Sequence, residues 1–363
     1  MKKLWVMIVL TALFLAGCSA EKSVGWTVTS DGENSYTLER ALPEHGDSGF
    51  IKVLYGQKGF FCRMADGSEL YYIADLQTGE LKKVGEAKNH SLTGRNYAMI
   101  GDTMYFYVTI RGSERPKNVL YAVDFSKEKM DTVCENTYNM KLIPLISLDG
   151  ELYALQGDLV GGKTVTFVER IEPNGKAERV EFDRGENAEE RRVLFMESDG
   201  EFVYTYEESA DTGYISKYDS GFSLVSELDI TNVVLQYPFG GVGAVRVFEN
   251  YFYLADLGGA SRLCRYDENG AEVILFDYAL EHVLNSGETE HEYFYIRRTN
   301  ELYRLDPKNC TFERVAVPDE GEDSVIRHMI SNNGTLLMAK CSSDVEADTW
   351  ERIYYYPCQR VTH

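Results

Sequence analysis

The chain has 363 residues, of which 44% are hydrophobic and 26% are charged, as is typical of a globular protein. Its 37 basic and 58 acidic residues give a formal net charge of -21 at pH 7. Such a charge repels phosphate backbones, which excludes nucleic acid as a partner.

The first residues have the three zones of an export signal. Lys2 and Lys3 are followed by an apolar run over residues 4–16, which is shorter than the ~20 residues that span a bilayer. The run ends at Leu15-Ala16-Gly17-Cys18, where small residues precede a nucleophilic thiol. We predict a signal peptide over residues 1–17, cleaved before Cys18.

These four residues resemble the lipobox of bacterial lipoproteins, in which a diacylglycerol is attached to the cysteine thiol. The resemblance implies a lipid on Cys18, with acyl chains such as palmitate. Stable anchoring takes more than one acyl chain, as a diacylglycerol provides. The chain would then lie on the extracytoplasmic face of the cell membrane or cell envelope. The alternative is an ordinary signal peptide with an incidental cysteine.

A short motif recurs after the signal: an apolar residue, two variable residues, a second apolar residue and an acid. Its copies end 39 to 51 residues apart, and the seventh is degenerate. Periods of this length indicate stacked supersecondary units. The last positions of the copies are Asp75, Asp124, Glu172, Asp219, Asp267, Asp306 and Pro357.

The pattern within each period predicts four short strands joined by tight turns. In the first unit we expect strands over Ile51–Tyr55, Phe60–Met64, Glu69–Asp75 and Glu80–Val84. Asp-Gly and Asn-Gly pairs are strong hairpin signals because both residues tolerate positive φ. They predict turns between first and second strands (A–B turns) at 149–150, 199–200 and 333–334, and between third and fourth strands (C–D turns) at 174–175 and 269–270.

Four strands repeated seven times predict an all-β fold, a β-propeller of seven four-stranded blades. A short linker over residues 18–24 would precede one propeller domain over residues 25–363. A β-sandwich array and a six-bladed ring with a stray hairpin are the alternatives. The recurring acid is expected to accept backbone N–H bonds in the C–D turn.

The ring must join its first and last blades. Gly25–Thr29 and Tyr36–Glu39 read as a hairpin around Asp31-Gly32, and one of its strands would complete the last blade beside Arg352–Tyr356. In the alternative, Gln359–Thr362 completes that blade and the hairpin packs on its side. We favour closure by the N-terminal segment.

The segment from Ala74 to Gly79 resembles the Ala-x-Asp-x-x-Thr-Gly core of quinoprotein-type propeller repeats. The tryptophan that docks neighbouring blades in that group is absent, and Val84 occupies the nearby position. The resemblance therefore implies a propeller without a quinone, and we expect no cofactor. The chain also resembles uncharacterised Tyr-rich propeller lipoproteins, for which no shared activity follows.

Six cysteines remain after Cys18, with no CxxC spacing, so no metal site is expected. Most of them lie in apolar strand patterns, where a free cysteine acts as a small hydrophobe. Export permits disulfides, and the alternative of a disulfide is worth testing only for Cys341 with Cys358.

Two segments of the sequence resemble catalytic motifs, and each lacks a residue that its motif requires. Gly46-Asp47-Ser48-Gly49-Phe50 departs from the serine-protease sequence at its fifth residue and reads as a loop. His291-Glu292 begins like a zinc-binding helix, but Tyr295 stands where the second His is needed. The residues around it alternate like a strand, so no catalytic residue is predicted.

Several arginines map to predicted connections between second and third strands (B–C loops). Arginine binds carboxylates and phosphates bidentately, so these residues are candidates for an acidic ligand. The loop over residues 237–240, Tyr-Pro-Phe-Gly, would add an aromatic platform. The alternative is that surface arginines balance nearby acids such as Glu114. The candidates are Arg111, Arg115, Arg262, Arg297 and Arg298.

Three functions are compatible with these features. The first is a binding or protein-interaction module whose ligand is a partner protein, a peptide, an acidic small molecule or an acidic glycan. The second is an envelope hydrolase or lyase with an active site at the channel mouth. The third is a scaffold or assembly factor in an envelope complex. Fold alone does not decide among them.

Overall fold

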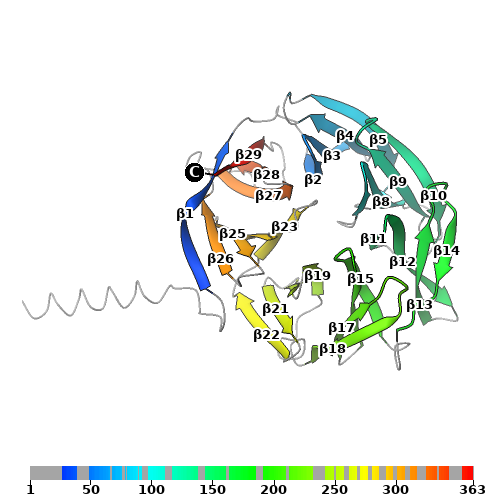
Figure 1. The fold of residues 1–363 in the computed structure, drawn as a ribbon. Coiled ribbons are helices and arrows are strands. Elements are labelled where there is room, and N and C mark those ends of the chain that lie inside the picture. Colours follow the sequence, from blue (N-terminus) through cyan, green and yellow to red (C-terminus); the bar gives the residue numbers. More distant parts are fainter. Residues whose placement is uncertain are drawn as a thin grey trace, which may run out of the picture.

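The computed structural model describes a nearly all-β chain between Thr27 and Thr362 (Figure 1). Up to residue 231 it describes residues 27–38, 49–65, 68–75, 78, 80–88, 90–91, 97–110, 117–137, 144–160, 163–184, 191–209 and 212–231. From residue 242 onward it describes strands separated by gaps, and side chains are described mainly between residues 53 and 231.

Five antiparallel sheets follow one another around a common centre (Figure 1). The first contains β2 (Gly49–Tyr55), β3 (Lys58–Ala65), β4 (Ser68–Asp75) and β5 (Leu81–Lys88). The second contains β7 (Tyr97–Ile100), β8 (Thr103–Ile110), β9 (Lys117–Asp124) and β10 (Lys129–Asn136), with the short β6 (His90–Ser91) beside β8. The third contains β11 (Leu145–Leu148), β12 (Glu151–Val160), β13 (Lys163–Ile171) and β14 (Ala177–Val180). The fourth contains β15 (Arg192–Ser198), β16 (Val203–Glu208), β17 (Gly213–Tyr218) and β18 (Leu224–Asp229), and the fifth contains β19 (Val242–Phe248), β20 (Tyr251–Asp256), β21 (Ser261–Asp267) and β22 (Gly270–Phe276).

The remaining strands form one closed arrangement in the order β1-β26-β25-β24-β23-β27-β28-β29. It divides into a sixth set, β23 to β26, and a seventh set, β27 to β29 completed by β1, so the strand order is consistent with seven four-stranded blades. The bounds are β1 (Thr27–Leu38), β23 (Leu280–Asn285), β24 (Glu292–Ile296), β25 (Glu301–Asp306), β26 (Thr311–Ala316), β27 (Ser324–Asn332), β28 (Thr335–Ser342) and β29 (Tyr354–Thr362).

The N-terminal segment closes the ring, but not as the expected hairpin. It is a single strand, β1, whose residues 34–38 pair antiparallel with β29 and whose residues 27–30 pair parallel with β26. The predicted Asp31-Gly32 turn falls where the register shifts between Ser30 and Ser35. The hairpin prediction was wrong because glycine also permits a local irregularity within a continuous strand. N-terminal closure was correct, and β29 contains Gln359–Thr362 together with the last three residues of the other proposed segment, whose first two residues lie outside the described part of the chain.

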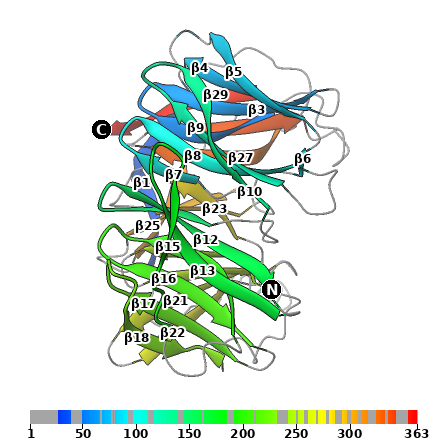
Figure 2. The ribbon, with the colours of Figure 1, turned by 90° about the vertical axis from the view of Figure 1, so that its right-hand side faces the viewer.

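The first strands of the sheets lie nearest the centre of the ring (Figure 1). β11 neighbours both β7 and β15, β15 neighbours β19, and β27 neighbours β2, which joins the last sheet to the first. Figure 2 shows the ring from the side, with the strands running between its two faces. Because the strands alternate in direction, B–C loops and the connections from a fourth strand to the next first strand (D–A connections) share one face. We call this the upper face.

The described core lies between neighbouring sheets. Phe60 and Tyr71 of the first sheet pack against Phe106 of the second, with ring centroids 5.4 Å from Phe106 in both cases. Tyr153 of the third sheet packs on Phe222 of the fourth at 5.0 Å. These rings are buried because strand residues alternate between the two faces of each sheet. The abundance of Tyr and Phe is thus explained, in this part of the chain, by packing.

The acid of the repeat closes the C–D turn as predicted. Asp75 Oδ1 accepts the Thr78 N–H at 2.7 Å, and Asp124 Oδ1 accepts the Ser126 and Lys127 N–H groups at 2.9 Å. Asp219 Oδ1 accepts two backbone N–H groups in the same way. The copy that ends at Glu172 differs, because the neighbouring Asn174 accepts the backbone bond instead, from the Lys176 N–H at 2.8 Å.

Two predictions about cysteines have different outcomes. Cys62 is buried and Cys134 half-buried, and neither is in a disulfide, as expected. The register excludes the alternative of a disulfide between Cys341 and Cys358. Cys358 lies opposite Leu336 in the register of β28 and β29, five residues from Cys341. At ~3.3 Å per residue the two Cα atoms lie about 17 Å apart, whereas a disulfide needs less than ~7 Å.

Candidate functional site

The predicted arginine cluster falls largely outside the described residues. Arg111, Arg115, Arg297 and Arg298 lie there, as do the loop at residues 237–240 and Cys18. Arg262 is in strand β21, opposite Leu254 and Leu275, and not in a B–C loop as expected. Only its placement in the loop was wrong, because β21 begins at Ser261, one residue before Arg262. Binding of an acidic ligand by the five arginines remains a prediction.

No group of three or more His, Cys, Asp or Glu side chains in the described part of the chain has an arrangement suited to a metal ion. Among these residues, no helix has the length and hydropathy needed to cross a bilayer.

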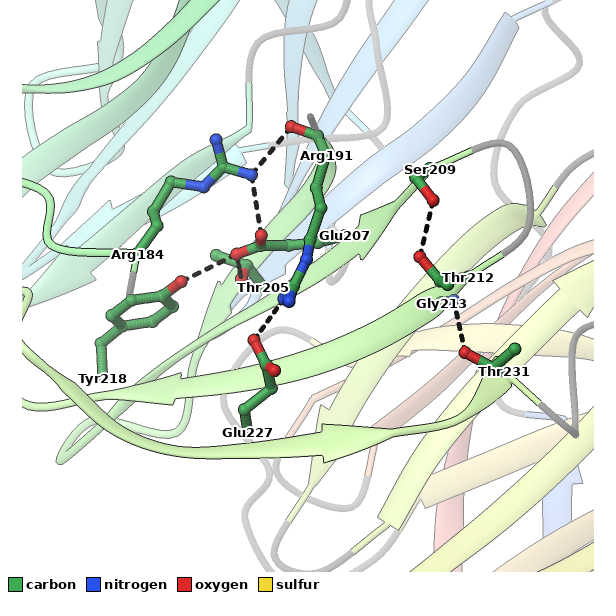
Figure 3. Close-up of polar contacts among 10 residues, drawn as sticks. All are labelled: Arg184, Arg191, Thr205, Glu207, Ser209, Thr212, Gly213, Tyr218, Glu227 and Thr231. Atoms are coloured by element: carbon green, nitrogen blue, oxygen red, sulfur yellow. Dashed lines mark hydrogen bonds and ion pairs between the residues drawn. The ribbon is translucent and has the colours of Figure 1, made fainter. Parts of the chain in front are cut away.

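The described polar groups converge instead on Glu207, in the fourth sheet (Figure 3). This carboxylate on β16 is fully buried, and three donors surround it. Arg184 Nη2 donates at 2.7 Å, the Tyr218 hydroxyl at 2.7 Å and the Thr205 hydroxyl at 2.9 Å. A buried charge is tolerated when it is paired and hydrogen-bonded in this way. We call these four residues the Glu207 cluster.

The Glu207 cluster holds the two described ends of the third D–A connection together. Arg184 comes just before residues 185–190 and Arg191 just after them, and Arg184 Nη2 also donates to the Arg191 carbonyl oxygen at 2.9 Å. The Arg191 guanidinium pairs with Glu227 of β18 and stacks over the Tyr214 ring at 3.7 Å. Both arginine side chains are only 11% exposed. The connection is therefore fixed to the fourth sheet at both ends.

The described ends of the neighbouring B–C loop contact the same sheet. The Gly213 N–H donates to the Thr231 hydroxyl at 3.2 Å, and the hydroxyls of Ser209 and Thr212 lie 2.6 Å apart across the loop. Figure 3 shows these contacts beside the Glu207 cluster. Two connections of the upper face are thus anchored on one blade.

Electrostatics keep the Tyr218 hydroxyl of the cluster protonated. Burial, followed by the nearby Glu207 charge, raises the pKa of Tyr218 well above its usual range, so this hydroxyl remains a donor at neutral pH. Both carboxylate oxygens of Glu207 are already occupied by donors. This arrangement suits rigid positioning of loops better than proton transfer to a substrate.

Buried polar groups occupy comparable places in other sheets. In the first sheet the buried Glu69, near the start of β4, accepts the Tyr71 hydroxyl at 2.8 Å and contacts the Cys62 thiol. In the second, the Thr109 hydroxyl donates to Asn118 at 2.8 Å. Each group lies beside a B–C loop, as Glu207 does. The upper ends of at least three blades are therefore held by polar side chains rather than by apolar packing alone.

Sequence reasoning missed Arg184 and Arg191. The available signal was their position, because they bracket an acidic connection that contains Glu186, Glu189 and Glu190. Charged residues flank any solvated loop in the same way. The pairing of Arg184 with Glu207 on β16 could therefore not be predicted from the spacing of residues in the sequence. It depends on how the strands of the fourth sheet align.

Comparisons with known proteins identify the fold. No protein-family model and no curated protein sequence matches the chain. Among solved structures, the β-propeller domain of Myceliophteria thermophila Cps50 (Swd1) aligns with a TM-score of 0.52 and 13% identity, covering 89% of this chain and 99% of that one. A chain from the S. cerevisiae Dbp5 complex with Nup159 and Gle1 aligns at 0.51 and 9% identity, covering 92% and 97%. A chain of the mitotic checkpoint complex aligns at 0.50 and 12% identity, covering 88% and 94%. The chain therefore has the fold of a β-propeller.

Proposed function

We propose that this propeller is a binding module for a partner protein, anchored by a lipid on Cys18 to the extracytoplasmic face of a membrane. The anchoring is supported by the basic start, the apolar run and the small residues before Cys18. The module reaches the membrane through its lipid, since its net charge of -21 opposes adhesion to anionic lipid headgroups.

The observation that carries the binding role is the double anchoring of the upper face at the fourth sheet. Arg184 and Arg191 fix one connection, and Thr231 holds the start of β17 after the adjacent loop. Loops held in place on a rigid scaffold lose little conformational freedom when a partner docks, which favours binding. The proposed partner is a protein of the same envelope compartment.

The test is crosslinking in intact membranes with matched arginine variants. Arg191→Ala removes the contact with Glu227, whereas Arg192→Ala removes an exposed pair with Glu208 on the same face. We expect wild type and Arg192→Ala to capture the same protein, and Arg191→Ala to capture about tenfold less. Purified protein that turns over an envelope glycan or ester, with no reproducible crosslinked partner, would overturn the proposal.

A further inference from the structure

The third sheet differs from its described neighbours in the length of its outer strand. In the first, second and fourth sheets the outer strands are β5, β10 and β18. Each pairs with the preceding strand along nearly its whole length. In the third sheet β14 has only four residues and pairs with Val168–Ile171 alone. The part of β13 from Lys163 to Thr166 extends past the end of β14.

β14 stops early because the chain leaves for the fourth sheet. Phe182 packs on Tyr218 with ring centroids 5.0 Å apart. The backbones of Asp183 and Ser223 form an isolated parallel β-bridge. These contacts draw the segment after Val180 away from β13. Within the described residues, no strand pairs with the outer edge of β13 at Lys163–Thr166.

Strand geometry identifies which backbone groups this edge presents. The Glu172 N–H donates to the Lys176 carbonyl at 2.9 Å, so the backbone groups of Glu172 face the side of β14. Alternate residues of an antiparallel strand face the same side. Thr164 and Thr166 therefore direct their N–H and C=O groups to the outer edge, while Val165 faces β12 opposite Asp158.

Exposed apolar side chains accompany this edge. Val160 is 59% exposed and Val165 is 43% exposed. Val160 lies opposite Lys163, and Val165 two residues further along β13, so the valines share one face of the hairpin. An edge strand with exposed apolar residues is the usual template for strand addition by another chain.

We propose that β13, at Lys163–Thr166, binds an extended segment of the partner protein as an added β-strand, with basic residues alternating with apolar ones. The apolar side chains of that segment cover Val160 and Val165. Its basic side chains are favoured by the net charge of -21, which repels a second copy of this chain. This inference rests on the proposed binding role and assigns it a surface.

The variants separate the backbone edge from the side chains. Thr166→Pro removes one outward N–H and leaves the pairing of Val165 with Asp158 intact. Val165→Lys places a charge on the exposed face. Val225→Lys is the control, since Val225 is 53% exposed on β18, in another sheet. Thermal unfolding of each full-length variant in detergent checks that it folds.

The probe is a fluorescent seven-residue peptide of alternating Val and Lys, compared with one of alternating Val and Glu. We expect the basic peptide to bind the full chain, and to bind about tenfold more weakly to Thr166→Pro and Val165→Lys but not to Val225→Lys. Equal binding to all variants, no binding up to about 1 mM, or preference for the acidic peptide would overturn the inference.

Membrane crosslinking separates this inference from the binding role itself. If Thr166→Pro captures the partner as well as wild type does, the binding role stands and the β13 edge is the wrong surface. If the hairpins of two copies crosslink to each other, the occupant is a second copy and the inference is overturned. Loss of the partner in Thr166→Pro but not in Val225→Lys supports it.

Discussion

Glu207 positions the residues around it by accepting their hydrogen bonds. It is fully buried on β16, and its partner Arg184 belongs to a segment that precedes the fourth sheet in the chain. Removing one member of such a buried pair leaves the other charge without compensation. The ion pair therefore holds the two described ends of the third D–A connection in place.

Glu207→Gln tests this role directly. The variant keeps the side-chain size and removes the charge that compensates Arg184, so we expect a loss of about 3 kcal/mol in the free energy of unfolding. Glu208→Gln, which weakens an exposed pair with Arg192, should cost under about 1 kcal/mol. Urea unfolding of both variants makes the comparison, and equal losses would contradict the burial argument.

Asp124 should make stability depend on pH. Hydrogen bonds from the Lys127 and Ser126 side chains and from the Lys127 backbone lower the pKa of Asp124 well below its usual range. A lowered folded-state pKa stabilises the fold above about pH 4 and loses this effect as the pH falls further. We expect Asp124→Asn to be less stable than wild type at neutral pH, and the gap to narrow below about pH 4 in urea unfolding. A gap that does not change with pH would contradict this assignment.

At the scale of strands and turns, local sequence patterns predict most of the described structure. The expected strand at Glu69–Asp75 is observed as β4, and the turn at Asp149-Gly150 joins β11 to β12, with both residues at positive φ. Local chemistry decides such features. The structure of β1 was predicted wrongly because it pairs with residues of β26 and β29 that lie 281 to 328 positions away in the chain.

Gly175, in the C–D turn of the third sheet, lies very close to strand β10 of the second sheet. It has φ of 84°, and a Cβ atom there would lie 2.2 Å from the Val133 carbonyl oxygen of β10. Gly200 has a similar φ of 96°, with no atom within 4 Å of such a Cβ. We expect Gly200→Ala to cost ~1–2 kcal/mol from backbone strain alone, and Gly175→Ala to cost at least ~1 kcal/mol more. Denaturant unfolding measures both, and equal costs would show that the two sheets separate easily at this point.

At the scale of the molecule, the propeller fold and its four-stranded units were predictable because the repeat carries its own turn signals. The arrangement around Glu207 was not, since it joins Arg184, a residue of β16 and a residue of β17, whose alignment depends on the whole sheet. The exposed edge of β13 could not be predicted from the sequence either. It arises from where β14 ends, and no motif marks that point.

β1 links the ring to the proposed anchor. It begins at Thr27, nine residues after Cys18, and pairs with strands of the sixth and seventh sets. A lipid on Cys18 would therefore hold the propeller close to the membrane at one side of the ring. This placement limits which faces can meet a partner.

Membrane fractionation of wild type and Cys18→Ser, with a labelled fatty acid in the growth medium, tests the central claim most directly. We predict that wild type takes up the label and stays with the membrane, whereas Cys18→Ser takes up none and is released as a folded propeller with an unchanged unfolding midpoint. A Cys18→Ser protein that remains in the membrane fraction, or a wild type that carries no label, would contradict the account.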